Sequence, residues 1–278
     1  MSHLAPDAAS AACFSPMKKT EYAAVETLRE DFSRLVKRLS RELPGLPALQ
    51  ERLRLELGYD DYRIETPVVY NRALDEVGPK DRIAFILVAD NPGKKEQLAA
   101  NNRYLVGQSG KLAEGFFRDR LGVDFRREVL ILNKTPIHTP KTAELRRLLS
   151  LADAAGKREG EGLRKAFRES QETMAALARR LHGSLGAAAK GDGGAGAILW
   201  VSGLGELREK GLFRPWAEAL GAAYEDAPAA LVDRVWLFNH FSMNQFAIEV
   251  KKKADPARPL LGELGRIGIE NRKRVLGW

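Results

Sequence analysis

The chain has 278 residues, of which 44% are hydrophobic and 29% are charged, and its formal net charge is +8. That length suits one large α/β domain, or one domain with helical extensions. No apolar run approaches the roughly 20 residues that a membrane span needs, and the first 20 residues lack the apolar core of a secretory signal. The single cysteine, Cys13, excludes an internal disulfide and a multi-cysteine metal cluster. We therefore expect a cytoplasmic protein with no membrane partner, associated with the nucleoid if the source is bacterial.

The N-terminal part of the sequence predicts a tail followed by helices. Residues 1–17 are rich in Ala and Ser, which predicts a disordered tail. From 21 to 57, apolar residues such as Val25, Leu28 and Phe32 recur at helical spacing. A break at Pro44-Gly45 divides this stretch, so a second helix is expected at 47–57. We interpret residues 18–80 as a helical extension that packs on the core.

Four short apolar runs predict buried parallel strands with helices between them. The strands are expected at 82–89, 128–132, 197–201 and 234–238. Helices are expected at 108–121, at 143–185 with a break near 156–162, and at 204–220, and a flexible loop at 191–196. This alternation predicts an α/β fold with a doubly wound sheet of about four mainly parallel strands flanked by helices. We expect one domain over 18–278, with core motifs at 81–245 and a basic C-terminal segment at 246–278.

Polar side chains follow each of the predicted strands. Asp90 and Asn91 follow the first, and Asn133, Ser202 and His240 lie at the ends of the next three. Open α/β sheets place their chemistry at the carboxyl ends of their strands. A carboxylate there can accept a proton from water, and an amide can orient that water by hydrogen bonds.

Several other kinds of site fit the sequence poorly. No pair of histidines has metal-ligand spacing, so no metal site is expected. Ser202 lies in Val-Ser-Gly-Leu-Gly, which lacks the first Gly of a serine nucleophile elbow. The stretch from Gly203 begins like a dinucleotide fingerprint, but Arg208 stands where its last Gly belongs. An α/β enzyme acting on some other small substrate stays open, although phosphate-loop signatures are missing.

Taken in chain order, these segments resemble the uracil-DNA glycosylase superfamily. The family's first motif, G-E-A-P-G or G-I-N-P-G, corresponds to Ala89-Asp-Asn-Pro-Gly93, and a stretch like P-F-V-G-x-A-G corresponds to Tyr104-Leu-Val-Gly-Gln-Ser-Gly-Lys-Leu-Ala113. The Asn that reads the base corresponds to Asn133. The family's small turn corresponds to Trp200-Val-Ser-Gly203, and its H-P-S motif to His240-Phe-Ser242. The resemblance covers residues 83–245.

The resemblance implies a monofunctional DNA glycosylase that removes uracil or a related deaminated base in base excision repair, without a cofactor. Such enzymes flip the nucleotide out of the stack and read its edge in a pocket. Asn133 would pair with that edge, and His240 would hydrogen-bond O2 of the departing base. Asp90 or Asn91 would hold the water that adds to C1′. The residues implied to bind DNA are Ser109, Ser202, Ser242, Met243, Asn244, Lys251, Lys252 and Lys253.

The chain departs from the family pattern at several positions. Asp90 and Asn91 combine the residues of two branches, and the iron–sulfur branch is excluded by the single cysteine. Leu105 stands where the family has the Phe that stacks on uracil, so Tyr104 is a candidate to take over that stacking. Gly93 replaces the Tyr that walls off C5 in the uracil-only branch. We therefore expect a looser pocket that admits thymine-like or 5-modified uracils.

The C-terminal segment is the most basic part of the chain. Residues 251–278 contain eight Lys or Arg and three Asp or Glu, a balance of +5. Two interpretations stay open: a DNA-facing surface driven by counterion release, or a solvated terminal helix. Residues 243–246 resemble an apolar wedge flanked by Lys, although an ordinary loop fits equally.

Two functions remain open from sequence. One is the glycosylase activity. The other is a catalytically weak or inactive nucleic-acid-binding relative, which Leu105 and the Phe241 in place of Pro make credible. In both, the partner is DNA, double- or single-stranded, and the protein is expected to be a monomer.

Overall fold

A parallel β-sheet forms the centre of the molecule in the computed structural model, which describes residues 16–186 and 196–278. The strand order is β2-β1-β3-β4, and every pairing is parallel. All residues of the strands are buried, as expected for a parallel sheet covered on both faces. The predicted α/β fold is therefore confirmed. The strands are β1 (Phe85–Ala89), β2 (Val129–Asn133), β3 (Ile198–Ser202) and β4 (Val235–Phe238).

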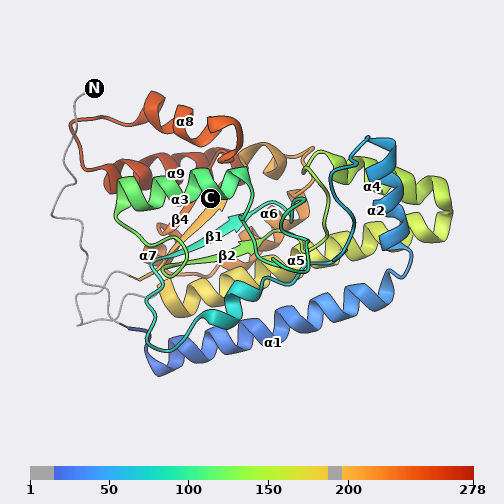
Figure 1. The fold of residues 1–278 in the computed structure, drawn as a ribbon. Helices are drawn as coiled ribbons and strands as arrows, with labels where there is room; N and C mark the ends of the chain where they lie inside the picture. Colours follow the sequence, from blue (N-terminus) through green and yellow to red (C-terminus); the bar gives the residue numbers. More distant parts are fainter. Residues whose placement is uncertain (1–15, 187–195) are drawn as a thin grey trace.

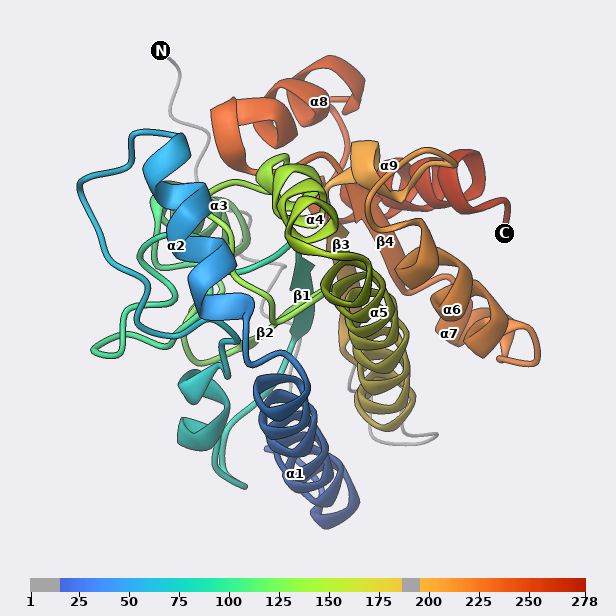
Figure 2. The same ribbon diagram turned by 90° about the vertical axis from the view of Figure 1, so that its right-hand side faces the viewer.

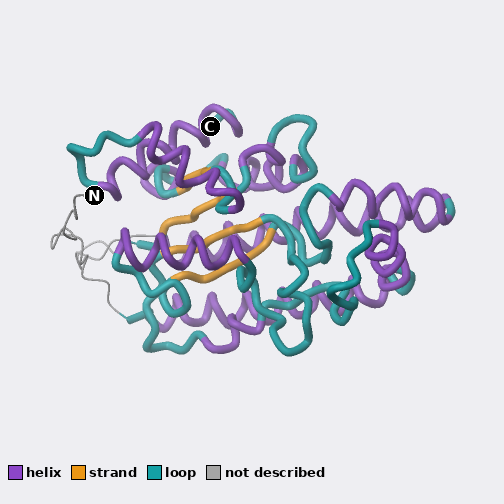
Figure 3. The backbone as a smooth tube through the Cα atoms, turned by 45° about the horizontal axis from the view of Figure 1, so that its top comes forward, coloured by secondary structure: helices purple, strands orange, loops and turns teal. Residues whose placement is uncertain are grey.

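Helices lie on both sides of the sheet (Figures 1 and 3). Along one side run α3 (Gln108–Leu121), α8 (Gln245–Lys253) and α9 (Leu260–Leu276); along the other run α5 (Lys157–Gly186) and α6 (Arg214–Tyr224). The remaining elements are α1 (Lys19–Glu42), α2 (Leu46–Glu56), η2 (Arg72–Glu76), α4 (Glu144–Ala155), η3 (Leu204–Leu207), α7 (Ala229–Val232) and η4 (Ser242–Asn244). Among the helices of the described ranges, none is both long and apolar enough to cross a bilayer.

The N-terminal helices pack on other helices rather than directly on the sheet. The long helix α1 lies along α5, and α2 lies against α4 (Figure 2). Val25, Leu28 and Phe32 form part of the buried face of α1, as their spacing predicts. The start of the expected tail, residues 1–15, lies outside the described residues. Met17, at its end, packs against the core and donates a backbone hydrogen bond to Asp81 O.

Local signals placed most helix ends correctly, with one clear exception. Helix α3 ends where Gly122 takes a left-handed conformation, with φ of 65°. The break expected near 156–162 is confined to Gly156, because α5 begins at the next residue. The continuous helix expected at 204–220 is wrong: a loop, 208–213, separates η3 from α6. There the backbone N–H of Phe213 donates to Glu206 O, 2.8 Å away. Of the expected loop at 191–196, residues 191–195 lie outside the described part.

The last helix belongs to the core. Leu264 and Ile267 of α9 are fully buried. Gly268 lies so close to β4 that a Cβ there would stand 2.5 Å from Trp236 Cβ. The terminal helix of the second interpretation is thus present, with one face packed on β4 and its charged residues Arg266, Lys273 and Arg274 exposed. Of this segment, α8 and the loop after it, 254–259, offer the more exposed surface.

Candidate functional site

Two strand ends meet at the point where the sheet reverses its order. From the central strand β1, the chain goes first to β2 on one side and then to β3 on the other, and open α/β sheets bind ligands at such a switch point. Asp90 follows β1, and Gly203 follows β3. Gly203 has φ of 92°, and a Cβ there would lie 2.5 Å from Asp90 Oδ1. A glycine at this position thus allows the carboxylate to fill the switch point.

The Asp90 carboxylate is buried and already has partners on both oxygens. Lys134 Nζ lies 2.5 Å from Oδ1, and Thr142 Oγ1 donates to Oδ2 at 3.2 Å. Lys134 itself is fully buried. Burial lowers the pKa of its ammonium group, while the Asp90 carboxylate acts in the opposite direction. Asp90 is therefore one half of a buried ion pair, and not the unengaged base that its place in the sequence suggests.

Asn133 and Ser202 present polar atoms that have no partner within the described structure. Asn133 is 1% exposed, and both its Oδ1 and its Nδ2 lack a hydrogen bond. The hydroxyl of Ser202, also 1% exposed, is unpaired as well. Buried polar groups are nearly always paired, so each exception asks for an explanation. A ligand that offers one donor and one acceptor would satisfy the Asn133 amide.

Asn91 is oriented toward a different segment from Asp90. Its Nδ2 donates to Thr139 Oγ1 at 2.9 Å, and its buried Oδ1 has no partner in the described part. Behind the same turn, His138 Nδ1 lies 2.8 Å from Pro92 O. Burial lowers the pKa of His138 to about 4, so the ring is neutral near pH 7 and donates through Nδ1. Asp90 and Asn91 are the two candidates to hold a water. Of these, Asn91 keeps a side-chain oxygen that has no hydrogen-bond partner within the described residues.

His240 is held in one tautomer by the residue pattern around it. The backbone N–H of Ser242 donates to His240 Nδ1 at 3.0 Å, and Ser242 Oγ lies 2.7 Å from the same atom. Because Nδ1 accepts, the neutral ring carries its proton on Nε2. Burial lowers the pKa of His240, a shift that Asp90 opposes and Lys134 reinforces. The strand end therefore offers a neutral imidazole donor, the group needed to stabilise a negatively charged leaving base.

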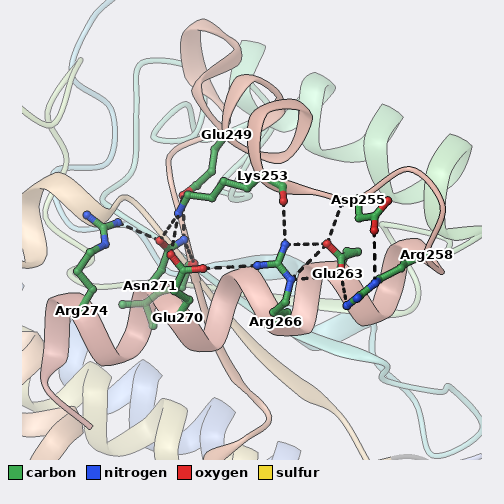
Figure 4. Close-up of polar contacts among 10 residues, drawn as sticks. Glu249, Lys253, Asp255, Arg258, Glu263, Arg266, Glu270, Asn271 and Arg274 are labelled. Atoms are coloured by element: carbon green, nitrogen blue, oxygen red, sulfur yellow. Dashed lines mark hydrogen bonds and ion pairs between the residues drawn. The ribbon is translucent and has the colours of Figure 1, made fainter.

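A buried carboxylate fixes α8 to the strand end that carries His240. Glu249 Oε2 accepts from Asn239 N at 3.0 Å, and Oε1 accepts from Asn271 Nδ2 at 2.9 Å. Figure 4 shows the side chain of Lys253 reaching from α8 toward Glu249 and Asn271. Its Nζ donates to Asn271 Oδ1, 3.0 Å away. Lys253 was expected to bind DNA. In this structure its ammonium instead joins α8 to α9, because the buried Glu249 attracts it.

The segment between His240 and α8 is anchored at both ends and exposed in the middle. Phe241 and Phe246 are buried, with ring centroids 4.7 Å apart. Between them Met243 is 81% exposed, and Met243 and Asn244 both have left-handed backbones, with φ of 52° and 57°. Two neighbouring non-glycine residues in this conformation are unusual. This backbone conformation directs the Met243 side chain into solvent, as the wedge hypothesis requires. Lys251 and Lys252 of α8 are also exposed.

The stacking role expected of Tyr104 is not available in this structure. Its side chain is fully buried, its hydroxyl donates to Val69 O at 2.7 Å, and its ring lies 6.4 Å from that of Phe32 in α1. The Tyr104 ring therefore packs toward α1. Leu105 is also buried and has a left-handed backbone, with φ of 53°.

Another buried carboxylate, Glu96, links two of the sequence motifs. Its Oε2 accepts from Gly93 N at 3.2 Å, and its Oε1 accepts from Leu105 N at 3.0 Å. Burial raises the pKa of Glu96 to about 7, although both backbone hydrogen bonds act against this shift. Gly110 packs directly on the backbone of Leu105. A Cβ at this position would lie 1.6 Å from Leu105 O, so only glycine fits.

The remaining predicted residues occupy the rim of this region. Ser109 lies in the first turn of α3 and is partly buried. A Cβ added at Gly93 would meet Pro140 O at 3.7 Å, an ordinary contact, so there is room for the first atom of a side chain. The polar cluster itself is closed, since Asn133, Ser202 and Lys134 are at most 1% exposed. A base would reach Asn133 only after the surrounding loops moved.

An open groove of about 370 Å³ lies elsewhere. It is at the amino edge of the sheet and is lined by Lys80, Asp81, Arg82, Asp124, Arg127 and Glu128. These side chains carry both signs of charge and compensate one another. The groove shares no residue with the polar cluster at the carboxyl edge.

Sequence reasoning did not find four residues that shape the site: Lys134, Thr142, Glu96 and Glu249. Lys134 gave a signal, because it directly follows the strand-end residue Asn133 in Asn-Lys-Thr-Pro. The other three lie away from strand ends, and nothing in their local sequence distinguishes them from exposed residues.

No family model matches the chain, and neither the curated proteins nor the solved structures contain a match. The resemblance to the glycosylase superfamily therefore depends on the short motifs alone.

Proposed function

We propose that this protein is a DNA glycosylase that flips uracil or a related deaminated base out of DNA and hydrolyses its N-glycosidic bond. The observation that carries the proposal is Asn133, a buried amide at the carboxyl end of β2, beside β1, with both polar atoms unpaired within the described residues. Such an amide matches a base edge with one carbonyl oxygen and one ring N–H, as in uracil and hypoxanthine. His240 supports it with an Nε2 donor for the departing base.

We assign a separate catalytic role to each side chain from the hydrogen bonds it makes. Asp90 places a fixed negative charge near the position where the sugar develops positive charge. Asn91 Oδ1, which has no partner in the described structure, accepts a hydrogen bond from the attacking water. Exposed Met243 fills the gap that the flipped base leaves, and Lys251 and Lys252 contact phosphates.

The test is base release from a labelled oligonucleotide that contains one uracil, hypoxanthine or xanthine, followed by alkali to cleave the abasic site. Wild type should produce a nick. Asn133→Ala and His240→Ala should lower the rate by about 100-fold or more, as removal of a preorganised donor does. Ser40→Ala, an exposed change on α1, is the control. Wild-type protein that binds the lesion but releases none of these bases would refute the proposal.

One observation favours the alternative, a nucleic-acid-binding relative without chemistry. Both oxygens of Asp90 are engaged, and the cluster is closed in this structure. This function predicts the same DNA affinity for wild type and Asp90→Asn, with no base release from either. Binding and cleavage measured on the same oligonucleotide separate the two functions.

A further inference from the structure

Lys134 joins the ends of three strands. It follows β2, and its backbone N–H donates to Ala89 O, the last residue of β1, at 2.9 Å. Its Nζ lies 2.5 Å from Asp90 Oδ1 and 2.5 Å from Ser202 O, the last carbonyl of β3. An ammonium group has three protons to donate and no acceptor. One donor is thus used on each side of the switch point, on Asp90 after β1 and on Ser202 of β3.

The rest of the ammonium group faces aromatic rings. Nζ lies 5.1 Å from the ring centroid of Phe213 and 5.9 Å from that of Trp216, and both side chains are fully buried. Lys134 has no exposed surface itself. Because two of its donors are committed to Asp90 and to the Ser202 carbonyl, its charge acts on a substrate through Asp90 and not by contact.

We propose that Lys134 is a positioning residue that holds the Asp90 carboxylate in a single orientation at the switch point. The inference rests on the glycosylase function proposed above. Lys134 restrains Oδ1, Thr142 restrains Oδ2, and the missing side chain of Gly203 leaves the space that the carboxylate occupies. Together these contacts leave the carboxylate little freedom to rotate.

The other charged groups that act on Asp90 come from two further elements. His240 follows β4, and Glu206 lies in η3. Glu206 is itself paired with Arg146 at 2.7 Å, which offsets its charge. Lys134 is therefore the close cation on Asp90 within the described residues, because the His240 ring is neutral near pH 7.

A purely structural ion pair would make different predictions. It would change the stability of the fold when broken, but it would leave the rate of the catalytic step unchanged. A positioning role lowers kcat with little effect on KM, because substrate binding does not use the pair. It also makes the effect of Lys134 depend on the presence of Asp90.

The experiment is a double-mutant cycle of Lys134→Met, Asp90→Asn and the double variant, assayed for the kcat and KM of uracil release. Lys134→Met should lower kcat by about 100-fold, the scale of one charged catalytic group, with KM within about threefold. The double variant, which buries no unpaired charge, should fold like wild type and match the rate of Asp90→Asn.

Three results would overturn the proposal. One is an equal loss from Lys134→Met in both the wild-type and the Asp90→Asn backgrounds. A second is a covalent protein–DNA adduct trapped by borohydride in wild type but not in Lys134→Met, which would mean that the amine itself reacts. The third does not depend on activity: a crystal structure of Lys134→Met with the Asp90 carboxylate unmoved. If wild type releases no base and yet the carboxylate moves in that variant, the proposed function fails while the positioning by Lys134 stands.

Discussion

Glu249 in α8 accepts a hydrogen bond from the backbone N–H of Asn239, 3.0 Å away, so the helix behind the exposed loop is fixed to the residue before His240. Its other oxygen accepts from Asn271 in α9. One buried carboxylate thus couples the loop that would enter DNA to the residue that would stabilise the leaving base. A movement of α8 on DNA would be transmitted to the end of β4.

We expect Glu249→Gln to weaken both the fold and the catalytic step. An amide cannot accept at both ends, so either Asn239 N–H or Asn271 Nδ2 loses its acceptor. The free energy of unfolding should fall by about 1–3 kcal/mol, the cost of one unsatisfied buried group, and uracil release should slow. Urea unfolding and single-turnover assays measure the two effects. The control is Glu270→Gln, a half-exposed glutamate in α9; equal behaviour of the two variants would contradict the coupling.

Glu96 should make stability depend on pH in the direction opposite to an ordinary surface carboxyl. Its pKa is about 7 in the folded protein, against a usual 4.5. Below about pH 4.5 the group is protonated in both states. Between 4.5 and 7 the folded state binds more protons than the unfolded state, so the contribution of Glu96 to stability is lost as the pH rises through 7. The full change is about 3 kcal/mol.

This contribution is measured as a difference, because buried histidines also titrate. Burial lowers the pKa values of His138 and His182 to about 4 and about 3, so these groups destabilise the fold as the pH falls. The free energy of unfolding of wild type minus that of Glu96→Gln removes their effect. That difference should decrease by about 3 kcal/mol between pH 4.5 and 8. A constant difference would show that the pKa of Glu96 is the same in the folded and unfolded states.

Gly203→Ala should displace the Asp90 carboxylate. The added Cβ would lie 2.5 Å from Asp90 Oδ1, and the backbone φ of 92° is strained for alanine. We expect a loss of stability of about 1–3 kcal/mol from overpacking, and a fall in kcat of at least about tenfold. Gly205→Ala is the matched control, since a Cβ there meets no atom within 4 Å. Thermal unfolding and uracil release that are the same for both variants would contradict this geometry.

Met243→Ala should slow base release from double-stranded DNA more than from single-stranded DNA. Only the duplex has a stacked partner to displace, and Met243, at 81% exposed, is placed to fill the resulting gap. Release rates on the two substrates, each relative to wild type, measure this selectivity. An equal effect on both substrates would mean that Met243 has no wedge role.

Lys251→Gln/Lys252→Gln should reduce the salt dependence of DNA binding. If each lysine contacts one phosphate, the slope of log K against log salt concentration should become shallower by about 2. The control is Lys19→Gln/Lys37→Gln on α1, which removes the same charge from the opposite side of the molecule (Figure 1). Equal slopes for the two double variants would place the DNA elsewhere.

The order of the elements and most of their boundaries could be predicted from local sequence. Short apolar runs indicate strands buried on both faces, and Gly122 ends α3 by its left-handed backbone. The strand ends are local too, so Asp90, Asn133, Ser202 and His240 could be expected at one edge of the sheet once the strands were known to be parallel. The failure at 204–220 is of another kind: a turn closed by a bond from Phe213 to Glu206 interrupts a helical pattern.

The composition and spacing of the chain by themselves determined a doubly wound α/β fold and which polar residues follow its strands. Only the tertiary structure decided that Lys134 neutralises Asp90, that Tyr104 turns toward α1, and that Lys253 is held by Glu249. The physical reason is the distance along the sequence over which each feature is determined. Hydrophobic periodicity is set by neighbours in the chain, whereas the direction and partner of a long side chain depend on burial by segments far away in sequence.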